Sequence, residues 1–439
     1  MTDSTASRPG SRPAPPDGAR GPVPATKAPA PTPPATPATS ALPGSAALPD
    51  TGPGGTSGTG TTAGALLHLV RTGRAATRSD LARVTGLSRS AVTSRVHALL
   101  DAGLLVEGGG STSTGGRPPG TLGLDVDAAV VVGIAVGRSR SQLGLFDLAG
   151  REIVGDTRDH VVGTAPGVLM PDVAARLAAL LAGTTVPVAG IGMSLPGTVD
   201  PETRMSLDAP VMGGWDGVAL GPYLAEVCPA PLHLANDTAA LAHSELFGVV
   251  PPADVLVVKA STGLGLGVVA DGRLLGAHRG ITGELGHTRI DAADGLLCRC
   301  GATGCLESLA GGWALVNTMV DEGHDVRHVR DLVQLALDGD TLARQLLRQS
   351  GRHLGEVLAT AVNLLHPGLV VVGGDMGAAF DLYTAGIRET VYARAAASVV
   401  RDLRFAPAAH GESAGLVGCA ALAIDAALTP AAVDAHLRA

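Results

Sequence analysis

The sequence predicts an α/β chain that follows a small, α-rich helix-turn-helix domain and a disordered tail. Strand and helix patterns alternate beyond Leu122, as in α/β folds. Three short helical patterns precede them, within residues 61–121. Residues 1–60 hold 14 of the 30 prolines and no aromatic side chain, and such a segment buries too little apolar surface to offset its ordering entropy. We therefore expect three domains or segments, at 1–60, 61–121 and 122–439.

The composition narrows the class of protein. The chain has 439 residues, too many for one ordinary core. Because 45% of the residues are hydrophobic but only 2% are aromatic, the cores must consist of Ala, Val and Leu. A net charge of -8 argues against a basic coat for nucleic acid. The sequence has no apolar run of about 18 residues or more and no signal-peptide pattern, so we expect a cytoplasmic protein that does not associate with a membrane.

Two helices joined by a tight turn predict the helix-turn-helix. A first helix covers Ala65–Val70, and the second, Thr77–Val84, ends at Thr85-Gly86. Ser88 then caps a third helix that extends to about Leu100, with apolar residues at helical spacing. This third helix is the candidate recognition helix.

A wing is expected after the recognition helix. It would consist of a short strand at Leu104–Val106 and a Gly/Ser/Thr-rich loop at Gly108–Gly120 whose Arg117 suits a minor groove. Residues 63–120 carry seven arginines against three acidic residues, a local excess of four positive charges that phosphate contact requires. Arginine reads guanine edges, and Ser or Thr suits bases or phosphates. The alternative is a helical domain whose arginines are merely solvated. The candidate DNA-binding residues are Ser88, Arg89, Ser90, Thr93, Ser94, Arg95 and Arg117.

Three cysteines and a histidine predict a metal site. His287, Cys298, Cys300 and Cys305 follow the pattern His-x10-Cys-x-Cys-x4-Cys, and three thiolates with one imidazole complete the tetrahedral set of a structural zinc. Clustered cysteines suit a metal in a reducing cytoplasm better than a disulfide framework. The alternative is a loop with three free thiols, in which His287 is a capping residue.

The remaining patterns predict the α/β framework. Apolar runs of strand length alternate with longer helical stretches. The expected strands are Ala129–Val136, Gln142–Asp147, Val188–Ser194, Pro231–Ala235, Val255–Lys259, Leu266–Ala270 and Leu369–Val372, and the expected helices are Thr238–Phe247 and Thr341–Leu365.

The motifs resemble those of the ROK family, which contains sugar kinases and sugar-responsive repressors. They are Gly283-Glu284-Leu285-Gly286-His287 and the run Cys298–Glu307, with Leu195–Asp200 and Asn236-Asp237-Thr238 upstream. The resemblance extends from about Ala63 to the C-terminus. It implies two lobes of the actin-like ATPase type that hold a sugar in the cleft between them.

The resemblance also implies the sugar-binding residues. Carried over position by position, they are Asn236, Asp237, Glu284, His287 and Glu307, with the backbone near Gly197 closing the pocket. His287 could bind zinc through one ring nitrogen and a sugar hydroxyl through the other. Taken alone, Asn236-Asp237 would be a helix cap and Glu284 a solvated carboxylate.

The resemblance leaves kinase activity open. Asp237 matches the catalytic base of the family's kinases, and one phosphate loop is kept in part around Thr262, Gly263 and Gly265. Where those kinases carry Asp-x-Gly-Gly-Thr, this chain has Ala135-Val136-Gly137-Arg138-Ser139. The acid is replaced by Ala135, and the side chain of Arg138 takes space that the triphosphate needs. We therefore expect weak or absent ATP binding.

The sequence thus favours a sugar-responsive transcription regulator, in particular a repressor that binds operator DNA as a homodimer or homotetramer. Its ligands would be structural zinc and a sugar or sugar derivative. The first alternative is an active ATP-dependent sugar kinase of the hexokinase or glucokinase type, with Asp237 as its base. The second is a DNA-binding protein whose effector domain has lost its ligand and only dimerises.

Overall fold

The computed structural model describes residues 61–108, 120–208, 212–247, 253–276 and 283–438. The tail at 1–60, which the sequence predicts to be disordered, lies outside the described residues, and so does Arg117 in the segment 109–119.

Each of the first three helices starts at a hydroxyl side chain. The helices are α1 (Ala63–Arg71), α2 (Arg78–Thr85) and α3 (Arg89–Asp101). Thr62, Thr77 and Ser88 precede them, and each hydroxyl accepts a hydrogen bond from the backbone amide three residues further on, which satisfies one donor that the helix leaves unpaired. Gly86 ends α2 in the left-handed conformation, with φ 71°. The predicted helix-turn-helix is confirmed.

The wing contains one strand that the sequence did not predict. β1 (Leu105–Gly108) pairs antiparallel with β2 (Thr121–Leu124), with Leu105 opposite Leu124. The expected loop therefore gives way to a second strand directly after Gly120. Leu105 and Leu122 are buried on the same core as the three helices, and this burial holds the wing against them.

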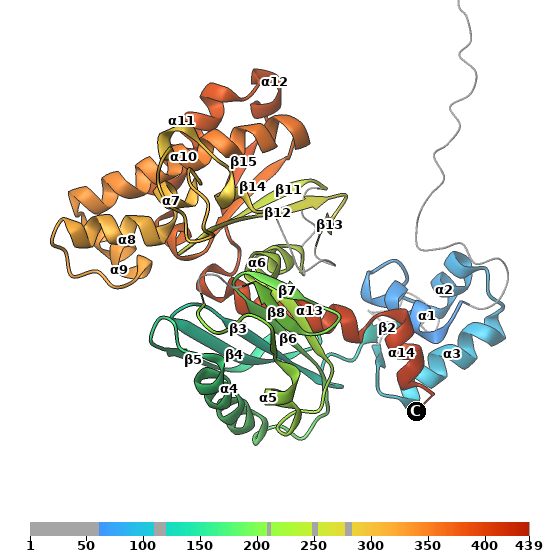
Figure 1. Ribbon diagram of the computed structural model, residues 1–439. Coiled ribbons are helices and arrows are strands. Elements are labelled where there is room, and N and C mark those ends of the chain that lie inside the picture. Colours follow the sequence, from blue (N-terminus) through green and yellow to red (C-terminus); the bar gives the residue numbers. More distant parts are fainter. Residues whose placement is uncertain (1–60, 109–119, 209–211, 248–252, 277–282, 439) are drawn as a thin grey trace, which may run out of the picture. The chain divides into compact units, whose positions relative to one another are not determined.

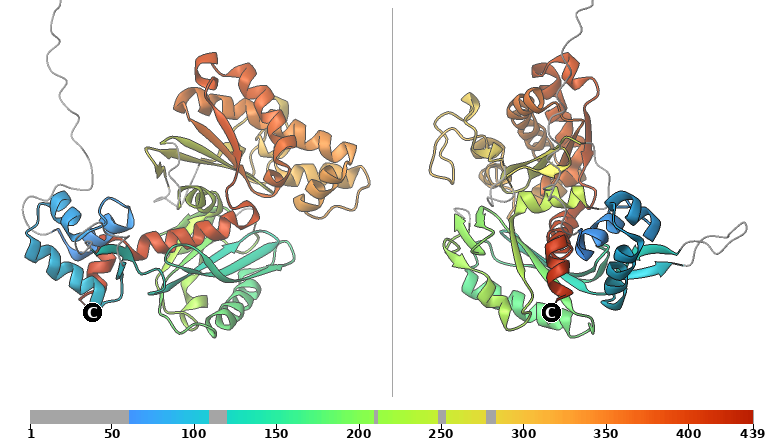
Figure 2. Two further views of the ribbon diagram at one scale, coloured as in Figure 1. Left: turned by 180° about the vertical axis from the view of Figure 1, so that it is seen from behind. Right: turned by 90° about the vertical axis from the view of Figure 1, so that its right-hand side faces the viewer.

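The first lobe of the α/β part is a five-stranded sheet in the order β10-β6-β3-β4-β5. β3, β6 and β10 run parallel, while β4 and β5 are antiparallel to their neighbours. Helix α4 (Pro166–Leu181) covers one face, and α13 (Ala414–Ala427) lies along the other (Figure 1, Figure 2). The strands are β3 (Val130–Val136), β4 (Arg140–Asp147), β5 (Glu152–Asp159), β6 (Val188–Leu195) and β10 (Leu232–Asn236).

The second lobe is another five-stranded sheet, in the order β13-β12-β11-β14-β15. Its apolar core gathers residues from these strands and from the helices that follow them, including the fully buried Tyr383 and Leu354. The strands are β11 (Val255–Ala260), β12 (Leu264–Ala270), β13 (Arg273–Leu274), β14 (Leu369–Gly373) and β15 (Arg404–Pro407). The helices are α8 (Gly312–Asp321), α9 (Val329–Asp338), α10 (Thr341–Leu365) and α11 (Phe380–Arg394).

Shorter elements complete the fold, and some of them line the cleft. Helix α6 (Asp237–Leu246) follows β10 directly, and α7 (Glu307–Ala310) follows the cysteine cluster. The others are β7 (Thr198–Asp200), β8 (Met205–Asp208), β9 (Val218–Ala219), α5 (Gly221–Ala225), α12 (Ala397–Val400) and the 3-10 helices η2 (Leu285–His287), η3 (Asp291–Ala293), η4 (Asp375–Ala379) and η5 (Gly411–Ser413).

Glycines bring α13 close to its neighbours. A β-carbon on Gly418 would lie 1.7 Å from the carbonyl oxygen of Ala240 in α6. One on Gly192 of β6 would lie 1.8 Å from the carbonyl oxygen of Cys419. Real β-carbons do not approach backbone atoms so closely, so glycine is required at both positions. Helix α13 is thereby wedged between β6 and α6.

The C-terminal helix α14 (Pro430–His436) packs against α1. The amide of Gly64 donates to Oδ1 of Asp434 at 2.8 Å, and Arg71 forms an ion pair with Asp425 near the end of α13. Most of the buried apolar residues of α13 and Val433 of α14 belong to the same buried cluster as those of the helix-turn-helix. The helix-turn-helix is therefore anchored to the C-terminal end of the chain.

The α/β framework agrees with the sequence-based prediction, since every expected strand and helix occurs with its ends shifted by at most two residues. In the part of the chain that the structure describes, no single helix is long and apolar enough to cross a membrane. One bent pair, Gly411–Ala427 with Pro430–His436, passes that test by length and composition alone.

Candidate functional site

A cavity of about 550 Å³ lies between the two sheets. From the first sheet it is lined by the β3–β4 turn and the start of α6, and from the second by the β11–β12 turn and residues near the cysteine cluster. All six residues that the resemblance assigns to sugar binding line this one cavity, although they come from four separate stretches of sequence: Gly197, Asn236, Asp237, Glu284, His287 and Glu307.

Asn236 has a structural role at the cavity wall. It is 5% exposed, and its side-chain oxygen accepts from the amide of Thr238 at 2.8 Å, as an N-cap of α6. Its side-chain nitrogen donates to the carbonyl oxygen of Gly197 at 2.7 Å. The helix-cap interpretation is thus confirmed for Asn236, and the same side chain fixes the Gly197 backbone beside the cavity.

Glu307 holds the second phosphate-type loop in place. The carboxylate is buried, and its two oxygens accept from the amide of Leu264 at 3.0 Å and from Nε1 of Trp313 at 3.2 Å. A β-carbon on Gly263 would lie 2.7 Å from Oε2 of Glu307. The glycine therefore lets the loop approach this carboxylate. Glu307 thereby fixes the loop that contains Thr262, Gly263 and Gly265.

Asp237 forms an ion pair that the sequence did not reveal. Its Oδ2 lies 2.9 Å from Nζ of Lys259 at the end of β11, and both side chains are 21% exposed. Burial lowers the pKa of Lys259, but the carboxylate of Asp237, supported by those of Asp375 and Glu307, raises the pKa by more. Lys259 is therefore a protonated ammonium group.

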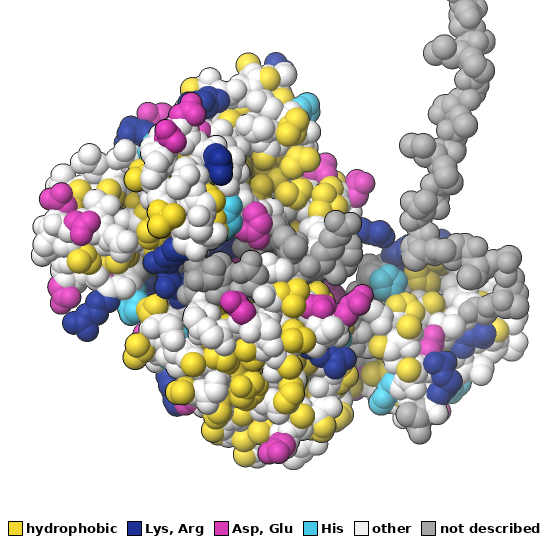
Figure 3. Space-filling model, viewed as in Figure 1, with side chains coloured by type: hydrophobic (Ala, Val, Ile, Leu, Met, Phe, Trp, Pro, Cys, Tyr) yellow, Lys and Arg dark blue, Asp and Glu magenta, His cyan; other side chains and the backbone are white. Residues whose placement is uncertain are grey.

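The residues predicted to form a degenerate first phosphate loop lie at the cavity. Ala135, Arg138 and Ser139 all line the cavity. Arg138 is half-buried; burial lowers the pKa of its guanidinium, and the charge of Glu307 opposes this change. Arg299, another lining residue, stacks on the ring of Trp313 at 4.4 Å. On the face shown in Figure 3, dark blue Lys and Arg side chains gather between the two lobes.

The candidate metal ligands converge. One ligand atom from each of His287, Cys298, Cys300 and Cys305 lies within 4.8 Å of all the others. Sγ of Cys300 is 3.8 Å from Sγ of Cys305, and Nδ1 of His287 is 3.7 Å from Sγ of Cys298. A tetrahedron with zinc–sulfur bonds of about 2.3 Å has edges of about 3.8 Å, so the four atoms fit such an ion.

His287 connects this cluster with the cavity. Its Nδ1 faces the cysteines, while Nε2 lies 3.8 Å from Oε2 of Glu284. Both His287 and Glu284 line the cavity, and the side chain of Glu284 is 52% exposed. The imidazole can therefore bind a metal through one nitrogen and present the other to a ligand.

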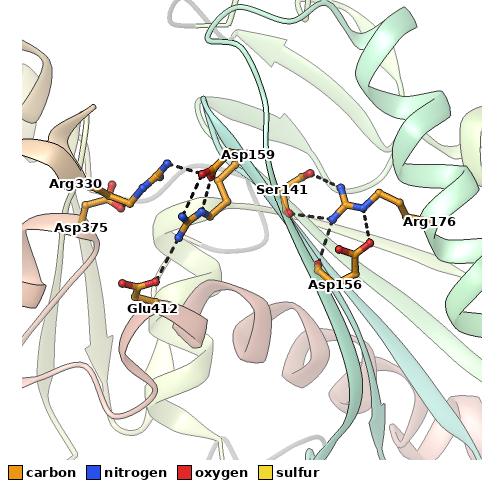
Figure 4. Close-up of polar contacts among 8 residues, drawn as sticks. Ser141, Asp156, Asp159, Arg176, Arg330, Asp375 and Glu412 are labelled. Carbon is orange, nitrogen blue, oxygen red and sulfur yellow. Dashed lines mark hydrogen bonds and ion pairs between the residues drawn. The ribbon is translucent and has the colours of Figure 1, made fainter. Parts of the chain in front are cut away.

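Ion pairs that include the cavity-lining residues Arg140, Arg330 and Glu412 bridge the two lobes (Figure 4). Asp159 at the end of β5 accepts from Arg140 of β4 at 2.7 Å and from Arg330 of α9 at 3.1 Å. Arg140 also reaches Glu412 of η5 at 3.3 Å. Since β5 belongs to the first lobe and α9 to the second, we call these four residues the interlobe bridge.

We expect Arg330→Gln to lower the melting temperature by a few degrees. Exposed ion pairs contribute up to about 1 kcal/mol each to the free energy of unfolding. In domains of this size, 1 kcal/mol corresponds to roughly 2–4 °C. The bond from Arg140 lowers the pKa of Asp159, and Arg330 adds to this effect. The contribution is therefore present above the ordinary pKa of aspartate and lost as the pH falls through the lowered value. Thermal melts of the full chain across an acid pH series would measure this.

Arg327→Gln is the matched control for the bridge, since Arg327 lies three residues away and pairs with the exposed Asp325. A melting temperature for Arg330→Gln equal to that of this control at neutral pH would show that the bridge contributes nothing.

The recognition helix α3 presents the predicted side chains to solvent. Ser88, Arg89, Ser90, Thr93 and Ser94 are exposed and Arg95 is partly exposed, while Val92, Val96 and Leu99 face the core. Figure 3 shows dark blue side chains over α3. Three arginines of the helix-turn-helix outside α3 have acidic partners: Arg71 pairs with Asp425, Arg78 with Glu107, and Arg83 with Asp80.

Fold and cleft together define a two-lobed, sugar-kinase-like protein that carries a winged helix-turn-helix. Comparison with protein families agrees: residues 131–426 match the ROK family model, and residues 59–112 match a MarR family model. The chain belongs to the ROK family.

Individual relatives match most of this chain. The xylose repressor of Bacillus subtilis (strain 168) is 27% identical over 354 residues, which covers 80% of this chain and 91% of that protein. The N-acetylglucosamine repressor of Escherichia coli O157:H7 is 26% identical over 342 residues, or 73% of this chain and 81% of that protein.

Solved structures show the same fold. A ROK family transcriptional regulator, described as a homolog of the E. coli MLC protein, is 25% identical, with a TM-score of 0.71 and coverage of 86% of this chain and 98% of that chain. A ROK family glucokinase from Streptomyces griseus, in complex with glucose and AMPPNP, is 28% identical, with a TM-score of 0.58 and coverage of 67% and 99%. The kinase thus matches a smaller share of this chain than the regulator does.

Proposed function

We propose that this chain is a sugar-responsive transcription repressor and not a sugar kinase. One observation carries the proposal. The chain combines a winged helix-turn-helix with a kinase-like cleft, and in that cleft two of the positions used for phosphoryl transfer in kinases are unfavourable for it. Arg138 lies in the first phosphate loop, and Lys259 is paired with the residue that corresponds to the kinase base. The names of the relatives support this, because a xylose repressor and an N-acetylglucosamine repressor match 80% and 73% of this chain.

The proposed DNA contacts come from α3 and the wing. Ser88, Arg89, Ser90, Thr93, Ser94 and Arg95 would lie in the major groove, with Arg117 in the adjacent minor groove. A homodimer or homotetramer would place two such helices about 10 base pairs apart, or a multiple of this distance, on an operator in bacterial cytoplasm.

The proposed effector is a sugar or sugar derivative in the cavity, contacted by Asp237, Glu284, His287 and Glu307, with Asn236 and Gly197 forming the wall. Zinc on His287, Cys298, Cys300 and Cys305 would fix the imidazole that faces the sugar. Sugar binding would shift the equilibrium between lobe arrangements and thereby change the affinity for DNA.

An active sugar kinase is the second candidate, because Asp237 lies in the cavity beside the glycine loop Gly263–Gly265. ADP release in the presence of sugar and ATP, abolished by Asp237→Asn, would support the kinase and contradict our proposal.

We expect the full chain to retard the DNA upstream of its own gene at moderate salt, and the matching sugar to change that retardation. Arg89→Ala should weaken DNA binding by about 1–3 kcal/mol, or about five- to 150-fold, because a base-reading arginine is lost. Titration in a gel-shift or anisotropy assay measures this.

Arg344→Ala, an exposed arginine on α10, is the control for loss of charge alone. If wild type does not retard the DNA, or if the Arg89 and Arg344 variants bind DNA alike, the proposed recognition helix is wrong.

A further inference from the structure

Lys259 is a rare residue type in this chain. The sequence has only two lysines, Lys27 and Lys259, against 30 arginines. Lys259 is the last residue but one of the apolar strand Val255–Ala260, where the other five residues are Val, Leu or Ala. Lysine differs from arginine in its compact charge and three tetrahedral donors, so a small ammonium group is what this position provides.

The sheet leaves space around this side chain. Lys259 pairs with Gly265 on β12 and with Gly373 on β14. Paired residues of neighbouring strands project to the same face. Because both partners are glycines, no side chain from β12 or β14 lies beside the aliphatic part of Lys259. The stem extends to the cavity, where the ammonium meets Oδ2 of Asp237 at 2.9 Å.

The ion pair changes what Asp237 can do. A general base must take up a proton from a sugar hydroxyl during phosphoryl transfer. Here an ammonium group binds one oxygen of the carboxylate and balances its charge. Asp237 is therefore held in place as an acceptor for a hydrogen bond from a sugar hydroxyl.

We propose that Lys259 is an effector-binding residue. Its ammonium holds Asp237 as a hydrogen-bond acceptor and donates another of its N–H groups to the oxygen of the same sugar hydroxyl. That hydroxyl is then read from both sides, as donor to Asp237 and acceptor from Lys259. This inference rests on the proposed function, because it assigns a further contact in the same sugar cleft. The proposed contact requires a neutral sugar with a hydroxyl between Asp237 and Lys259.

The test compares sugar binding by the full-length wild type and Lys259→Met, which keeps an unbranched stem and removes the charge. Calorimetry with D-xylose, D-glucose and N-acetyl-D-glucosamine finds the sugar that binds the wild type. The expected result is at least tenfold weaker binding of that sugar to Lys259→Met. Arg273→Met, an exposed cation on β13 of the same sheet and not part of the cavity lining, should bind like wild type.

A second measurement does not depend on the stability of the variant. An amine-acylating reagent is applied to wild-type protein with and without the sugar, and the Lys259 peptide is quantified by mass spectrometry against urea-denatured protein. The bound sugar should slow acylation of Lys259 at least fivefold, because it covers the ammonium.

The outcomes are distinct. Equal affinity of wild type and Lys259→Met for the same sugar, or acylation that the bound sugar does not slow, would overturn the role of Lys259 and leave the sugar-responsive repressor standing. Failure of wild type to bind any of the three sugars would overturn this contact together with the sugar response proposed above.

Discussion

Gly418→Ala is expected to destabilise the protein by about 3 kcal/mol or more, at the upper end for an added core methyl group. The new β-carbon would lie 1.7 Å from the carbonyl oxygen and 2.5 Å from the carbonyl carbon of Ala240, so α6 and α13 must separate. At roughly 2–4 °C per kcal/mol, thermal melts should show a fall of roughly 6–12 °C. Because α6 begins at Asp237, sugar binding should weaken as well.

Gly415→Ala gives the matched control on the same helix. The nearest neighbour of its added β-carbon is Cβ of Ala135 at 3.8 Å, an ordinary contact. Alanine is also the better helix former by about 1 kcal/mol, so this variant should melt at or above the wild-type temperature. If both variants melt alike, the close crossing of α13 and α6 does not contribute as we argue.

The sequence predicts the elements with strong periodicity and misses those without it. β3 and α10 carry long apolar patterns and are found within one residue of the expected ends. β5, with the sequence Glu-Ile-Val-Gly-Asp-Thr-Arg-Asp, is an exposed edge strand and has no alternation to detect. β2 is only four residues long and follows a glycine-rich stretch of sequence, so its pairing with β1 decides its conformation.

The candidate site divides in the same way. The six residues proposed to bind a sugar lie in short motifs, and each motif is visible without knowledge of the fold. The contacts between motifs are not visible. Asp159 and Arg330 are separated by 171 positions, and Lys259 meets Asp237 only because β11 of one sheet ends beside the start of α6. Such pairs follow from sheet register and lobe packing, which local patterns do not specify. The lone lysine in an apolar strand was the available signal for Lys259.

Cys305→Ala is expected to remove a structural zinc and to lower the melting temperature by more than replacement of a buried cysteine outside the cluster. Cys305 is 1% exposed, and its sulfur lies 3.8 Å from that of Cys300. A structural zinc site adds binding free energy of about 10 kcal/mol or more to the folded state in small zinc domains. Elemental analysis should find one zinc per wild-type chain and none in the variant, and a chelator should bring the wild-type melting temperature close to that of the variant.

Cys228→Ala separates the loss of a metal ligand from the loss of a buried thiol. Cys228 is 3% exposed, within the core of the first lobe and apart from the cluster. Its replacement should keep the zinc and cost only the small cavity that a lost sulfur leaves. Loss of zinc should also weaken sugar binding, because Nδ1 of His287 would lose the partner that orients Nε2 toward the cavity. The zinc prediction would be wrong if wild-type protein contained no zinc and Cys305→Ala melted like Cys228→Ala. The cluster would then be a loop with three free thiols and a histidine.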